Sequence, residues 1–550
     1  MAIRDAVAHW YPETEGFTLI ESVVGAALKE QAARAPGALA LVYEDETRSI
    51  ALTYQALDTK TDQLATALLA WGVKKQDRVA VLSPNSPEWV YLEYALAKIG
   101  AILVTVNTAL KKDEIGYICR QAEVSTLFFV DNVRGYDIAS AIEALKPDLP
   151  LLERLCCLEG KSRSAISFTE LMENSAEHGP DIPHSLTPQP NDIAQIQFTS
   201  GTTGAPKGAM LSHRSILNNA RMSAARGGFC ASDRLLSAMP LFHTAGCVCN
   251  VLGMLSCGGT LILMPSFDPQ SMIRLMIKHE ATIINAVPTM YIRMLEALES
   301  WPKKPENWSL RIAYTGGTSI PPSMMRDLKA TFDLQPMIIM GMTEASPIIT
   351  QTRPSDDFET QITTAGTPLP HTEIRIVDPE TGDTRKCGEP GELLIRGYQV
   401  TKGYYAMPDA TAKAIDADGW LHSGDLAVLQ KEGYLSIVGR IKDMLIRGGE
   451  NIYPVEIENF LMGHPAVAEA QVVGVPDPDL GEEIFAFVKC TPGASVNSVE
   501  LEQYCRANMS RQKLPRYFHF MEHFPLTANG KVQKYELRTI AAEMLKGNAA

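Results

Sequence analysis

The stretch QFTSGTTGAPKGAMLSH, residues 197–213, combines glycines, hydroxyl groups and a lysine in a density that a simple surface turn does not require. Its residues 199–208 hold three glycines, four hydroxyl side chains and one lysine. Glycine lets the backbone approach a ligand closely and adopt positive φ, and N–H groups that converge at such a turn bind anions. The composition therefore predicts a loop that holds a phosphate-rich ligand such as a triphosphate. The predicted contacts come from Thr199, Ser200, Gly201, Thr202, Thr203, Gly204 and Lys207.

The flanks of this loop predict that it joins a strand to a helix. AQIQF, residues 194–198, has the apolar character of a strand, and SHRSILNNARMSAA, residues 212–225, is typical of a helix with Ser212 as its N-cap. The lysine stands in Pro206-Lys207-Gly208, which is not the G-x-x-x-x-G-K-[ST] spacing of GTPases and kinases. A flexible surface loop is the structural alternative.

The chain on the N-terminal side alternates between strand and helix patterns. Helices are predicted over residues 53–73, 86–100 and 111–123, the second with Ser86 as N-cap and Pro87 at its first position. Short apolar strands are predicted over residues 78–84, 101–107 and 125–131. This rhythm indicates a parallel sheet covered by helices.

The pattern returns after residue 190 and then changes. Further strand–helix units are predicted around residues 259–266, 281–288 and 311–317, and shorter strands and turns begin at about Glu373. A compact α+β pattern follows Arg440. We predict an α/β fold with a large N-terminal domain, residues 1–440, of parallel-rich sheets covered by helices plus a small β-subdomain. A small mobile α+β domain, residues 441–550, would follow.

Composition excludes several classes of function. The chain has 550 residues and a formal net charge of -14, which argues against general nucleic-acid binding. No apolar run approaches about 18 residues, so no membrane span is predicted. The ten cysteines are scattered without a C-x-x-C pair, which indicates reduced thiols rather than a zinc site or a disulfide framework. The N-terminus has no signal-peptide pattern, and a cytoplasmic location is predicted.

Seven motifs in a fixed order make the chain resemble the adenylate-forming superfamily, which includes acyl-CoA synthetases, peptide-synthetase adenylation domains and firefly-type luciferases. The resemblance spans nearly the whole chain and is greatest to medium-chain fatty acyl-CoA synthetases. The motifs are FTSGTTGAPKGAMLSH (198–213), MPLFHTAG (239–246), YTGGTSIPP (314–322), MGMTEASP (340–347), GWLHSGDLA (419–427), GRIKDMLIRGGENIYPVEIE (439–458) and PLTANGKVQKYELR (525–538).

The resemblance implies an acid–thiol ligase that uses ATP, Mg²⁺ and coenzyme A in two half-reactions. A carboxylate first attacks the α-phosphorus of ATP, which gives acyl-AMP and pyrophosphate. A thiol then displaces AMP. The first step brings an anion to a polyanion, so the site must neutralise charge and hold the two reactants in line.

The same resemblance assigns the charged residues of the site. Lys531 would bridge the carboxylate and the α-phosphate, while the nearby Lys534 is expected to be surface-exposed. Glu344 would bind Mg²⁺, to which one carboxylate with phosphate oxygens and waters is suited, and Thr343 would contact the α-phosphate. The structural alternatives are an exposed C-terminal lysine and an ordinary helix start.

Ribose and phosphate contacts are assigned to two further residues. Asp425 would accept hydrogen bonds from the ribose hydroxyls, and Arg440 would reach ribose and phosphate. An Asx-turn and a surface ion pair are the respective structural alternatives.

The adenine side of the site is assigned to apolar and small residues. Gly316 and Gly317 resemble the turn that lies along adenine, and Met340 stands where the family commonly has an aromatic residue. A thioether can still pack against a purine. Gly341 and Met342 of the same motif are predicted to contact the nucleotide.

Three positions relate to the acid and the thiol. His243 matches the family position that gates the space between the acid and the thiol, although a packed core histidine is the structural alternative. Lys442 matches a hinge, because Lys531 must enter the site for the first step and leave a path for the pantetheine arm in the second. Gly448 and Gly449 would line the thiol tunnel, or simply form a hairpin turn.

The expected acid is apolar. Residues 243–254, 285–295, 314–325 and 338–348, which would wall the acid pocket, are rich in Met, Ile, Val, Ala and Cys and contain almost no charge. This favours a medium-chain or branched fatty acid, or an alicyclic or aryl acid. The predicted partners are small molecules, with a homodimer left open. A carrier-protein acceptor, a luciferase-like oxidative second step and a non-catalytic adenylate-binding protein remain alternatives.

Overall fold

The structure is a computed structural model that divides the chain into two compact units. It describes residues 7–173, 182–183, 186–199, 205–302, 307–318, 320–491, 493–525 and 532–547. The larger unit comprises Trp10–Ile374 and Ile395–Leu421, and the smaller unit comprises Met1–His9, Arg375–Leu394 and His422–Ala550. The boundary predicted at residues 440–441 stays a prediction.

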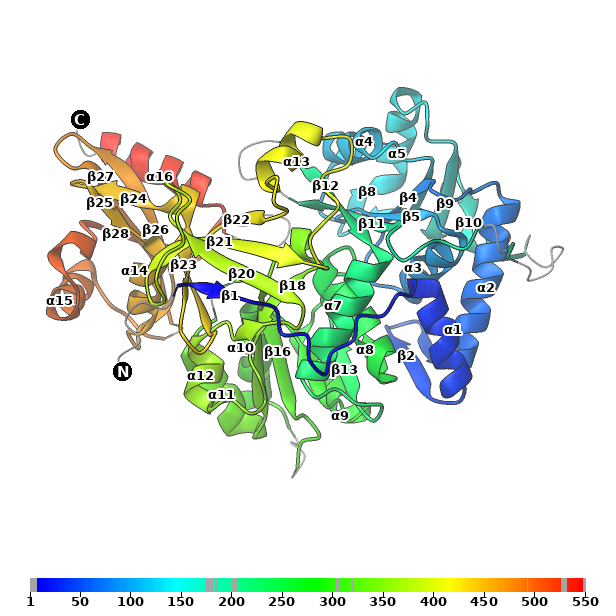
Figure 1. Cartoon of the computed structure of the whole chain (residues 1–550), viewed down its shortest axis with the longest axis horizontal. Coiled ribbons are helices and arrows are strands. Elements are labelled where there is room, and N and C mark those ends of the chain that lie inside the picture. The colour runs from blue at the N-terminus through cyan, green and yellow to red at the C-terminus, as the bar shows by residue number, and fades with distance from the viewer. Residues whose placement is uncertain are drawn as a thin grey trace. The chain divides into compact units, whose positions relative to one another are not determined.

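The first sheet of the larger unit has seven strands, among them β11 and β12, which flank the glycine-rich segment in the chain (Figure 1). All neighbouring strands are parallel except the last pair, β11 and β12. In spatial order the strands are β10 (Ile166–Ser167), β9 (Arg154–Glu159), β6 (Thr126–Val130), β4 (Arg78–Leu82), β5 (Ile102–Thr105), β11 (Ile193–Thr199) and β12 (Lys207–Ser212).

The second sheet of the larger unit has nine strands, with a parallel centre and antiparallel strands at both ends. In spatial order these are β19 (Thr367–Pro368), β18 (Ile348–Gln351), β17 (Gln335–Gly341), β16 (Ile312–Gly316), β15 (Ile283–Asn285), β13 (Arg234–Ser237), β14 (Thr260–Leu263), β2 (Leu39–Glu44) and β3 (Ser49–Thr53). A separate two-stranded ribbon consists of β7 (Asn132–Val133) and β8 (Tyr136–Asp137).

Helices separate and cover the two sheets. The main α-helices of this unit are α1 (Val24–Arg34), α2 (Tyr54–Ala70), α3 (Pro87–Ile99), α4 (Lys112–Gln121), α5 (Ile138–Leu145), α6 (Phe168–Glu173), α7 (His213–Arg226), α8 (Gly253–Cys257), α9 (Pro269–Lys278), α10 (Pro288–Glu299), α11 (Pro322–Phe332), α12 (Phe358–Thr363) and α13 (Pro408–Ala414). Tighter or wider turns are the 3₁₀ helices η1 (Lys146–Asp148) and η5 (Thr343–Ala345) and the π-helix η4 (Ala245–Leu252).

Three apolar clusters show how these layers are built. Val79 and Val81 of β4 pack into a cluster with α1, α2, α3, α7 and strands of the nine-stranded sheet, so these helices lie between the two sheets. Ala80 and Leu82, which point the other way, pack with α4 and α5. The outer face of the nine-stranded sheet is covered by α9, α10 and α11. Each central strand is buried on both faces, which is why these strands are continuous apolar runs.

The predicted helix starts are confirmed by their caps. The Ser86 hydroxyl accepts a hydrogen bond from the Trp89 N–H at 3.2 Å, with Pro87 at the first position of α3. The Ser212 hydroxyl accepts from the Ser215 N–H at 3.1 Å at the start of α7. Each such cap stabilises its helix by about 1 kcal/mol.

The smaller unit contains most of one antiparallel sheet and an α+β region. The sheet has the order β1 (His9–Trp10), β20 (Thr372–Val377), β21 (Pro390–Gly397), β22 (Leu421–Leu429) and β23 (Leu435–Arg440). The second sheet has the order β25 (Glu450–Ile452), β24 (Leu445–Arg447), β27 (Gly481–Cys490) and β26 (Val467–Asp477), with β28 (Tyr517–Phe520) also on β27. Its helices are η6 (Ile441–Asp443), α14 (Pro454–Met462), α15 (Ser498–Asn508), η7 (Arg511–Lys513) and α16 (Lys534–Gly547).

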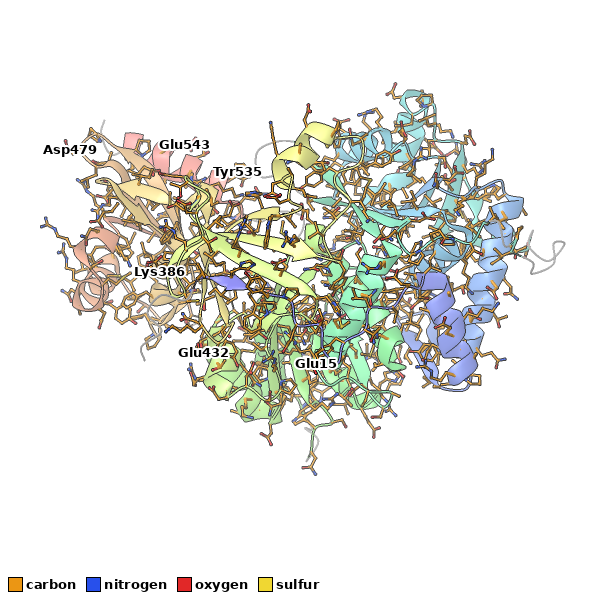
Figure 2. All side chains as sticks on the ribbon, in the orientation of Figure 1. Glu15, Lys386, Glu432, Asp479, Tyr535 and Glu543 are labelled. Atoms are coloured by element: carbon orange, nitrogen blue, oxygen red, sulfur yellow. The ribbon has the colours of Figure 1, made fainter. Side chains whose placement is uncertain are left out.

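These elements confirm the predicted fold class, with parallel-rich sheets covered by helices, a small antiparallel sheet and an α+β region. The acidic balance of the chain is visible at the surface, where exposed carboxylates such as Glu432, Asp479 and Glu543 project outward (Figure 2). Among the described residues, no helix combines the length and the apolar character needed to cross a membrane.

Candidate active site

The glycine-rich loop joins two antiparallel strands, which corrects the predicted strand-to-helix connection. β11 and β12 pair in a register that places Thr199 opposite Lys207, and α7 begins only after β12. Ser200, Gly201, Thr202, Thr203 and Gly204 lie outside the described residues. The loop is therefore held by a hairpin, and the N-terminus of α7 is not directly at its end.

Strand β12 escaped prediction because its sequence, KGAMLS, is a poor strand by propensity. Tertiary packing overrides that preference. Gly208 lies so close to β11 that an added Cβ would come within 2.8 Å of Ile196 Cγ2. The missing side chain thus allows the hairpin to close tightly.

Glu344 lies at the base of this hairpin, buried and within reach of two hydroxyl groups. Its side chain is on the 3₁₀ helix η5, and the residue is 7% exposed. Its Oε1 accepts a hydrogen bond from the Tyr404 hydroxyl at 2.9 Å and a longer one from Thr199 Oγ1 at 3.4 Å. The fold therefore brings together Thr199 and Glu344, two predicted site residues that are 145 positions apart.

The backbone around Glu344 is fixed on both sides. Gly341, at the end of β17, admits no side chain, because a Cβ there would lie 2.0 Å from the Pro347 carbonyl oxygen. Met342 N–H donates to that same oxygen at 2.9 Å. The Glu344 carbonyl accepts from Thr401 N–H at 2.8 Å. Thr343, the first residue of η5, is half-buried beside the carboxylate-bearing residue.

Lys207 lies on the face of Tyr404. Its ammonium nitrogen is 5.1 Å from the centre of the Tyr404 ring, a cation–π distance. Tyr404 therefore contacts the loop lysine with its ring and Glu344 with its hydroxyl. Burial, with the Glu344 carboxylate as a second cause, raises the pKa of Tyr404, so the phenol is a hydrogen-bond donor at neutral pH.

Tyr404 is the site residue that sequence reasoning missed. It lies in KGYYAMPD, a segment without a recognised motif, and it meets Glu344 across 60 residues of chain. The available signal was weak: a buried tyrosine needs a partner for its hydroxyl. The sequence does not predict which residue accepts the hydrogen bond from the Tyr404 hydroxyl.

The ends of β16 and β17 hold the residues assigned to adenine. These strands are parallel neighbours, with Gly316 opposite Ile339. A Cβ on Gly316 would lie 2.4 Å from the Ile339 carbonyl oxygen, and Gly317 has a φ of 82°, so glycine is required at both positions. Met340 is buried in β17. Open α/β sheets bind ligands at such carboxyl ends of strands.

His243 lies two residues before the π-helix η4. Its Nδ1 accepts a hydrogen bond from Ala245 N–H at 3.1 Å, and the ring is half-buried. Gly246 allows the tight bend that follows, because a Cβ there would lie 2.3 Å from the Pro240 carbonyl oxygen. π-Helical turns are frequent at functional sites.

A buried polar chain connects η4 to strand β11. Glu93 Oε1 accepts from Gln195 Nε2 at 2.8 Å, and Gln195 Oε1 accepts from Gln197 Nε2 at 2.7 Å. Gln197 Nε2 also lies 3.1 Å from Cys247 Sγ. Burial raises the pKa of Glu93 well above its usual value, which favours the neutral form of this carboxyl. The strand that ends at Thr199 is thereby tied to the helix that follows His243.

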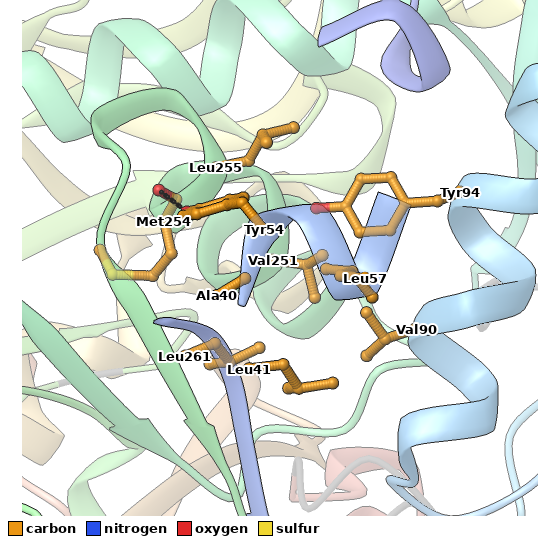
Figure 3. Close-up of a pocket in the computed structure, with 10 residues that line it drawn as sticks. All are labelled: Ala40, Leu41, Tyr54, Leu57, Val90, Tyr94, Val251, Met254, Leu255 and Leu261. Atoms are coloured by element: carbon orange, nitrogen blue, oxygen red, sulfur yellow. Dashed lines mark hydrogen bonds between the residues drawn. The ribbon is translucent and has the colours of Figure 1, made fainter. Parts of the chain in front are cut away.

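The apolar cavity drawn in Figure 3 is not the predicted acid pocket. It lies in the larger unit and measures about 10 Å³, which is room for about one water molecule. Tyr54 donates its hydroxyl to the Met254 carbonyl at 3.1 Å beside it (Figure 3). The position of the acid pocket stays a prediction. The lining residues of the cavity are Ala40, Leu41, Tyr54, Leu57, Val90, Tyr94, Val251, Met254, Leu255 and Leu261.

In the smaller unit, Asp425 and Arg440 form an ion pair. The two residues face each other in the β22–β23 register, and Arg440 Nε donates to Asp425 Oδ1 at 3.0 Å. The arginine side chain is 44% exposed and the aspartate side chain 15% exposed. The surface ion pair considered as a structural alternative for Arg440 is thus present, with the carboxylate expected to bind ribose as its partner.

Lys442 is the middle residue of η6, among several charges. Burial, the largest cause, lowers its pKa despite the neighbouring Asp443 carboxylate. Asp443 itself accepts from Arg538 of α16 at 3.2 Å. Gly448 and Gly449, with φ of 60° and 85°, form the two-residue turn between β24 and β25. That turn requires positive φ at both residues, so their hairpin role is sufficient to explain both glycines.

Lys531 lies outside the described residues, but both flanks of its segment are fixed. Gln533 N–H donates to the Pro525 carbonyl at 2.8 Å. Lys534 was expected to be surface-exposed, and that expectation is wrong. Its ammonium group pairs with Glu458 of α14 at 2.6 Å, and its side chain is only 16% exposed. The exposed residue here is its neighbour Tyr535, at 62% (Figure 2).

The donor set around Glu344 fits a magnesium ion bound with a nucleotide. The described residues contain no group of three or more His, Cys, Asp or Glu side chains that could hold a metal alone. A single buried carboxylate beside hydroxyl groups suits Mg²⁺, which takes one or two carboxylates and completes its shell with phosphate oxygens and water. Glu344 would be the residue that holds it.

Comparison with known protein families gives two matches along the chain. The family model described as AMP-binding enzyme matches residues 28–405, and the model described as AMP-binding enzyme C-terminal domain matches residues 456–531. The first covers more than half of the chain. The protein belongs to the AMP-binding enzyme family. The resemblance inferred from the seven motifs is thereby confirmed.

Two curated relatives extend this assignment over the full length. "Putative acyl-CoA synthetase YngI" of Bacillus subtilis is 40% identical over 543 residues, which cover 96% of this chain and 98% of the relative. The mitochondrial medium-chain acyl-CoA ligase ACSF2 of Mus musculus is 35% identical over 550 residues, covering 96% and 89%. This member of the family is accordingly an AMP-forming acid–thiol ligase of the acyl-CoA synthetase type.

Solved structures agree with the chemistry of this family. The anthranilate CoA ligase AuaEII in complex with anthranoyl-AMP matches with a TM-score of 0.86 at 26% identity, covering 96% of this chain and 99% of that one. O-succinylbenzoate CoA synthetase (MenE) of Bacillus subtilis, in complex with ATP and magnesium, matches with a TM-score of 0.78 at 29% identity, covering 94% and 99%. The predicted ATP, magnesium and coenzyme A chemistry, which proceeds through an acyl-adenylate, is confirmed.

Proposed function

We propose that this ligase activates an apolar carboxylic acid and transfers it to coenzyme A, and that the residues assigned above carry out the reaction. The observation that carries the proposal is the cluster at the hairpin base, where Glu344, Thr199, Lys207 and Tyr404 meet. A magnesium-bound triphosphate needs a buried carboxylate held by hydroxyl donors, and here an ammonium group lies separately over the ring of Tyr404.

In the first half-reaction, a carboxylate oxygen attacks the α-phosphorus and pyrophosphate leaves. Lys531 would lie between the two anions and reduce their repulsion, and Thr343 would donate to the α-phosphate. Such charge stabilisation is commonly the largest single contribution to catalysis. Gly316, Gly317, Met340, Gly341 and Met342 would contact the base side of the nucleotide.

In the second half-reaction, the thiolate of coenzyme A attacks the acyl carbon and AMP leaves. His243 would gate the space between the acid and the thiol. Lys442 would act as a hinge, so that the segment carrying Lys531 withdraws and Gly448 and Gly449 approach the pantetheine arm. Asp425 and Arg440 would hold the ribose and phosphate of AMP.

The acid is a medium-chain or branched fatty acid, or an alicyclic or aryl acid. Support comes from the buried residues on the expected walls, among them Val248, Met294, Met325 and Ile338, which carry no charge. The name of the murine relative, a medium-chain acyl-CoA ligase, favours the same range. The charged side chains on these walls are Arg293 and Glu344, and Glu344 is assigned to magnesium, so an acidic or amino substituent would find little to pair with.

The test measures AMP and pyrophosphate release over a panel of carboxylic acids with and without coenzyme A. The proposal expects pyrophosphate with apolar acids and acyl-CoA only when coenzyme A is present. Preference for a dicarboxylate or an amino acid would contradict it. Oxidised product formed from the adenylate and oxygen without coenzyme A would favour the luciferase-like alternative instead.

A variant of Lys531 tests whether this residue acts only in the first half-reaction. Lys531→Ala should reduce acyl-AMP formation by at least about a hundredfold, because removal of one stabilising donor has effects of that order. Thioester formation from supplied acyl-AMP should be nearly unchanged. Lys534→Ala is not a suitable control, since Lys534 is paired with Glu458. Equal loss in both half-reactions would contradict the two-conformation scheme.

A cytoplasmic location and a homodimeric state are also proposed. The murine relative is named as mitochondrial, so the cytoplasm and the mitochondrion are the two locations to compare. Fluorescence microscopy of the tagged full chain and light scattering of the purified enzyme test these two points.

A further inference from the structure

We propose that Tyr404 is a positioning residue that holds the Glu344 carboxylate in the orientation that a magnesium-bound nucleotide requires. The inference deepens the proposed function and rests on it. No motif points to Tyr404, and its role follows from contacts that only the folded chain makes.

Two hydroxyl groups converge on one oxygen of Glu344. The Tyr404 hydroxyl donates to Oε1 at 2.9 Å, and Thr199 Oγ1 lies 3.4 Å from the same atom. The shorter contact has ordinary hydrogen-bond geometry, and the longer one is weak. With Oε1 held in this way, Oε2 is the oxygen that remains for a cation.

Tyr404 is itself held in place by the strap of residues 401–405, which runs along β12. Met210 N–H donates to the Gly403 carbonyl at 2.9 Å, and Tyr405 N–H donates to the Gly208 carbonyl at 2.8 Å. Tyr404 N–H donates to Thr411 Oγ1 at 2.9 Å. The phenol is therefore fixed by backbone pairing to the same hairpin that carries the phosphate loop.

The ring of Tyr404 also orients Lys207, whose ammonium group lies over it at 5.1 Å. One buried side chain thus contacts both the carboxylate expected to face magnesium and the lysine expected to face phosphate. This explains why a tyrosine, rather than a phenylalanine of similar bulk, stands here.

A neutral donor suits this task better than a cation would. An arginine or lysine at this position would neutralise Glu344 and compete with the metal. A phenol fixes the carboxylate and leaves its negative charge available. A phenol ordinarily titrates at about pH 10, so the hydroxyl donates a hydrogen bond to the carboxylate at neutral pH.

The adjacent tyrosine supplies a matched control. Tyr405 donates its hydroxyl to Glu123 Oε2 at 2.7 Å, an exposed contact away from Glu344. Tyr404→Phe and Tyr405→Phe each remove one hydroxyl from neighbouring residues on the same strap. Only the first should affect the magnesium requirement.

The experiment measures ATP binding by isothermal titration calorimetry at a series of Mg²⁺ concentrations, together with the binding of Mn²⁺ to the enzyme–ATP complex by electron paramagnetic resonance. Tyr404→Phe should need about tenfold more Mg²⁺ for half-maximal ATP binding, which is what loss of one hydrogen bond to a charged group produces. Tyr405→Phe should match the wild type. Thioester formation from supplied acyl-AMP should be unchanged in Tyr405→Phe.

A double-mutant cycle distinguishes positioning from a general structural role. In the Glu344→Gln background, Tyr404→Phe should cause no further change in Mg²⁺ dependence, because its effect passes through the carboxylate. An additive effect there, or an unchanged Mg²⁺ dependence in Tyr404→Phe alone, would overturn the proposal. So would a parallel loss of both half-reactions with a lowered melting temperature. Failure of the proposed function would appear instead in the wild type, as absence of pyrophosphate release with apolar acids.

Discussion

Glu344 and Asp425 are both carboxylates assigned to one nucleotide, and the two regions that hold them treat the charge differently. Glu344 is buried in the larger unit and held by the hydroxyl groups of Tyr404 and Thr199. Asp425 is in the smaller unit and is already paired with the exposed guanidinium of Arg440. The first region keeps its charge available for a cation, whereas the second has its charge balanced before a ligand arrives.

The two carboxylates have different partners because the ligand groups that they would bind differ in charge. A metal ion needs a full negative charge, so a cation beside Glu344 would weaken the site. Ribose hydroxyls are neutral and need only an acceptor, so Asp425 can keep an arginine partner. Exposed ion pairs contribute little to stability, about 0–1 kcal/mol. The Asp425–Arg440 pair therefore serves better as a ligand contact than as a structural support.

The largest effect is expected at the buried carboxylate. Glu344→Gln keeps the shape and the acceptor for Tyr404 but removes the charge. Acyl-AMP formation, measured as pyrophosphate release, should fall by about a hundredfold to a thousandfold. Thioester formation from supplied acyl-AMP should be preserved. A fall of less than tenfold would mean that Glu344 does not hold the metal.

A smaller effect is expected at the exposed pair. Asp425→Asn should raise KM for ATP by about tenfold to thirtyfold, because the ribose would lose a hydrogen bond to a charged acceptor. The melting temperature should stay close to that of the wild type, because the pair is exposed. The exposed Asp418 serves as the control, since Asp418→Asn should change neither quantity. A large fall in stability with unchanged KM would show that the Asp425–Arg440 pair supports the fold and does not contact ATP.

The hinge assignment predicts an effect confined to one half-reaction. Lys442→Ala should slow thioester formation by about tenfold, because a hinge variant slows the conformational change that precedes this step. Acyl-AMP formation should stay within about twofold of the wild-type rate. Stopped-flow measurements of each half-reaction separate the two. Lys413→Ala, on exposed α13, is the matched control. If acyl-AMP formation falls instead, Lys442 acts within the nucleotide site rather than as a hinge.

The smallest effect on the reaction is expected at Glu93, a third carboxyl, whose neutral form is favoured by burial. The pKa of Glu93 is higher in the folded chain than in the unfolded chain, where it is near 4.5. The stability that Glu93 contributes is therefore complete below pH 4.5 and is lost as the pH rises toward the pKa of the folded state. The Glu93→Gln variant does not titrate at this position, so its stability does not fall with pH for this reason. Its melting temperature relative to the wild type should therefore rise between pH 5 and pH 8, with pyrophosphate release little changed. A difference that does not vary with pH would show that Glu93 is ionised in the folded protein.

Local patterns predicted much of the fold because they depend on neighbouring residues. The caps at Ser86 and Ser212 were readable because a short side chain, a proline or a first helical turn lies within three positions. The central strands were readable because burial on both faces leaves continuous apolar runs. Strand β12 was missed because its residues are poor strand formers, and its pairing with β11 depends on the close approach at Gly208.

The site divides in the same way. Glu344 and Thr199 could be named from motifs, but their meeting across 145 residues could not. Tyr404 carries no motif and is identified only by where its hydroxyl points. Lys534 was misjudged because an isolated lysine is usually exposed, whereas here Glu458 is buried and its charge requires a partner.

The sequence by itself determined the family, the chemistry and the residue types that carry charge, since these are written in short motifs whose order and spacing leave few alternatives. Only the tertiary structure decided which of those charges meet neutral donors and which meet cations. The physical reason is that a motif specifies chemistry over a few residues, while desolvation and hydrogen bonding depend on atoms that long stretches of chain bring within 3–4 Å of each other.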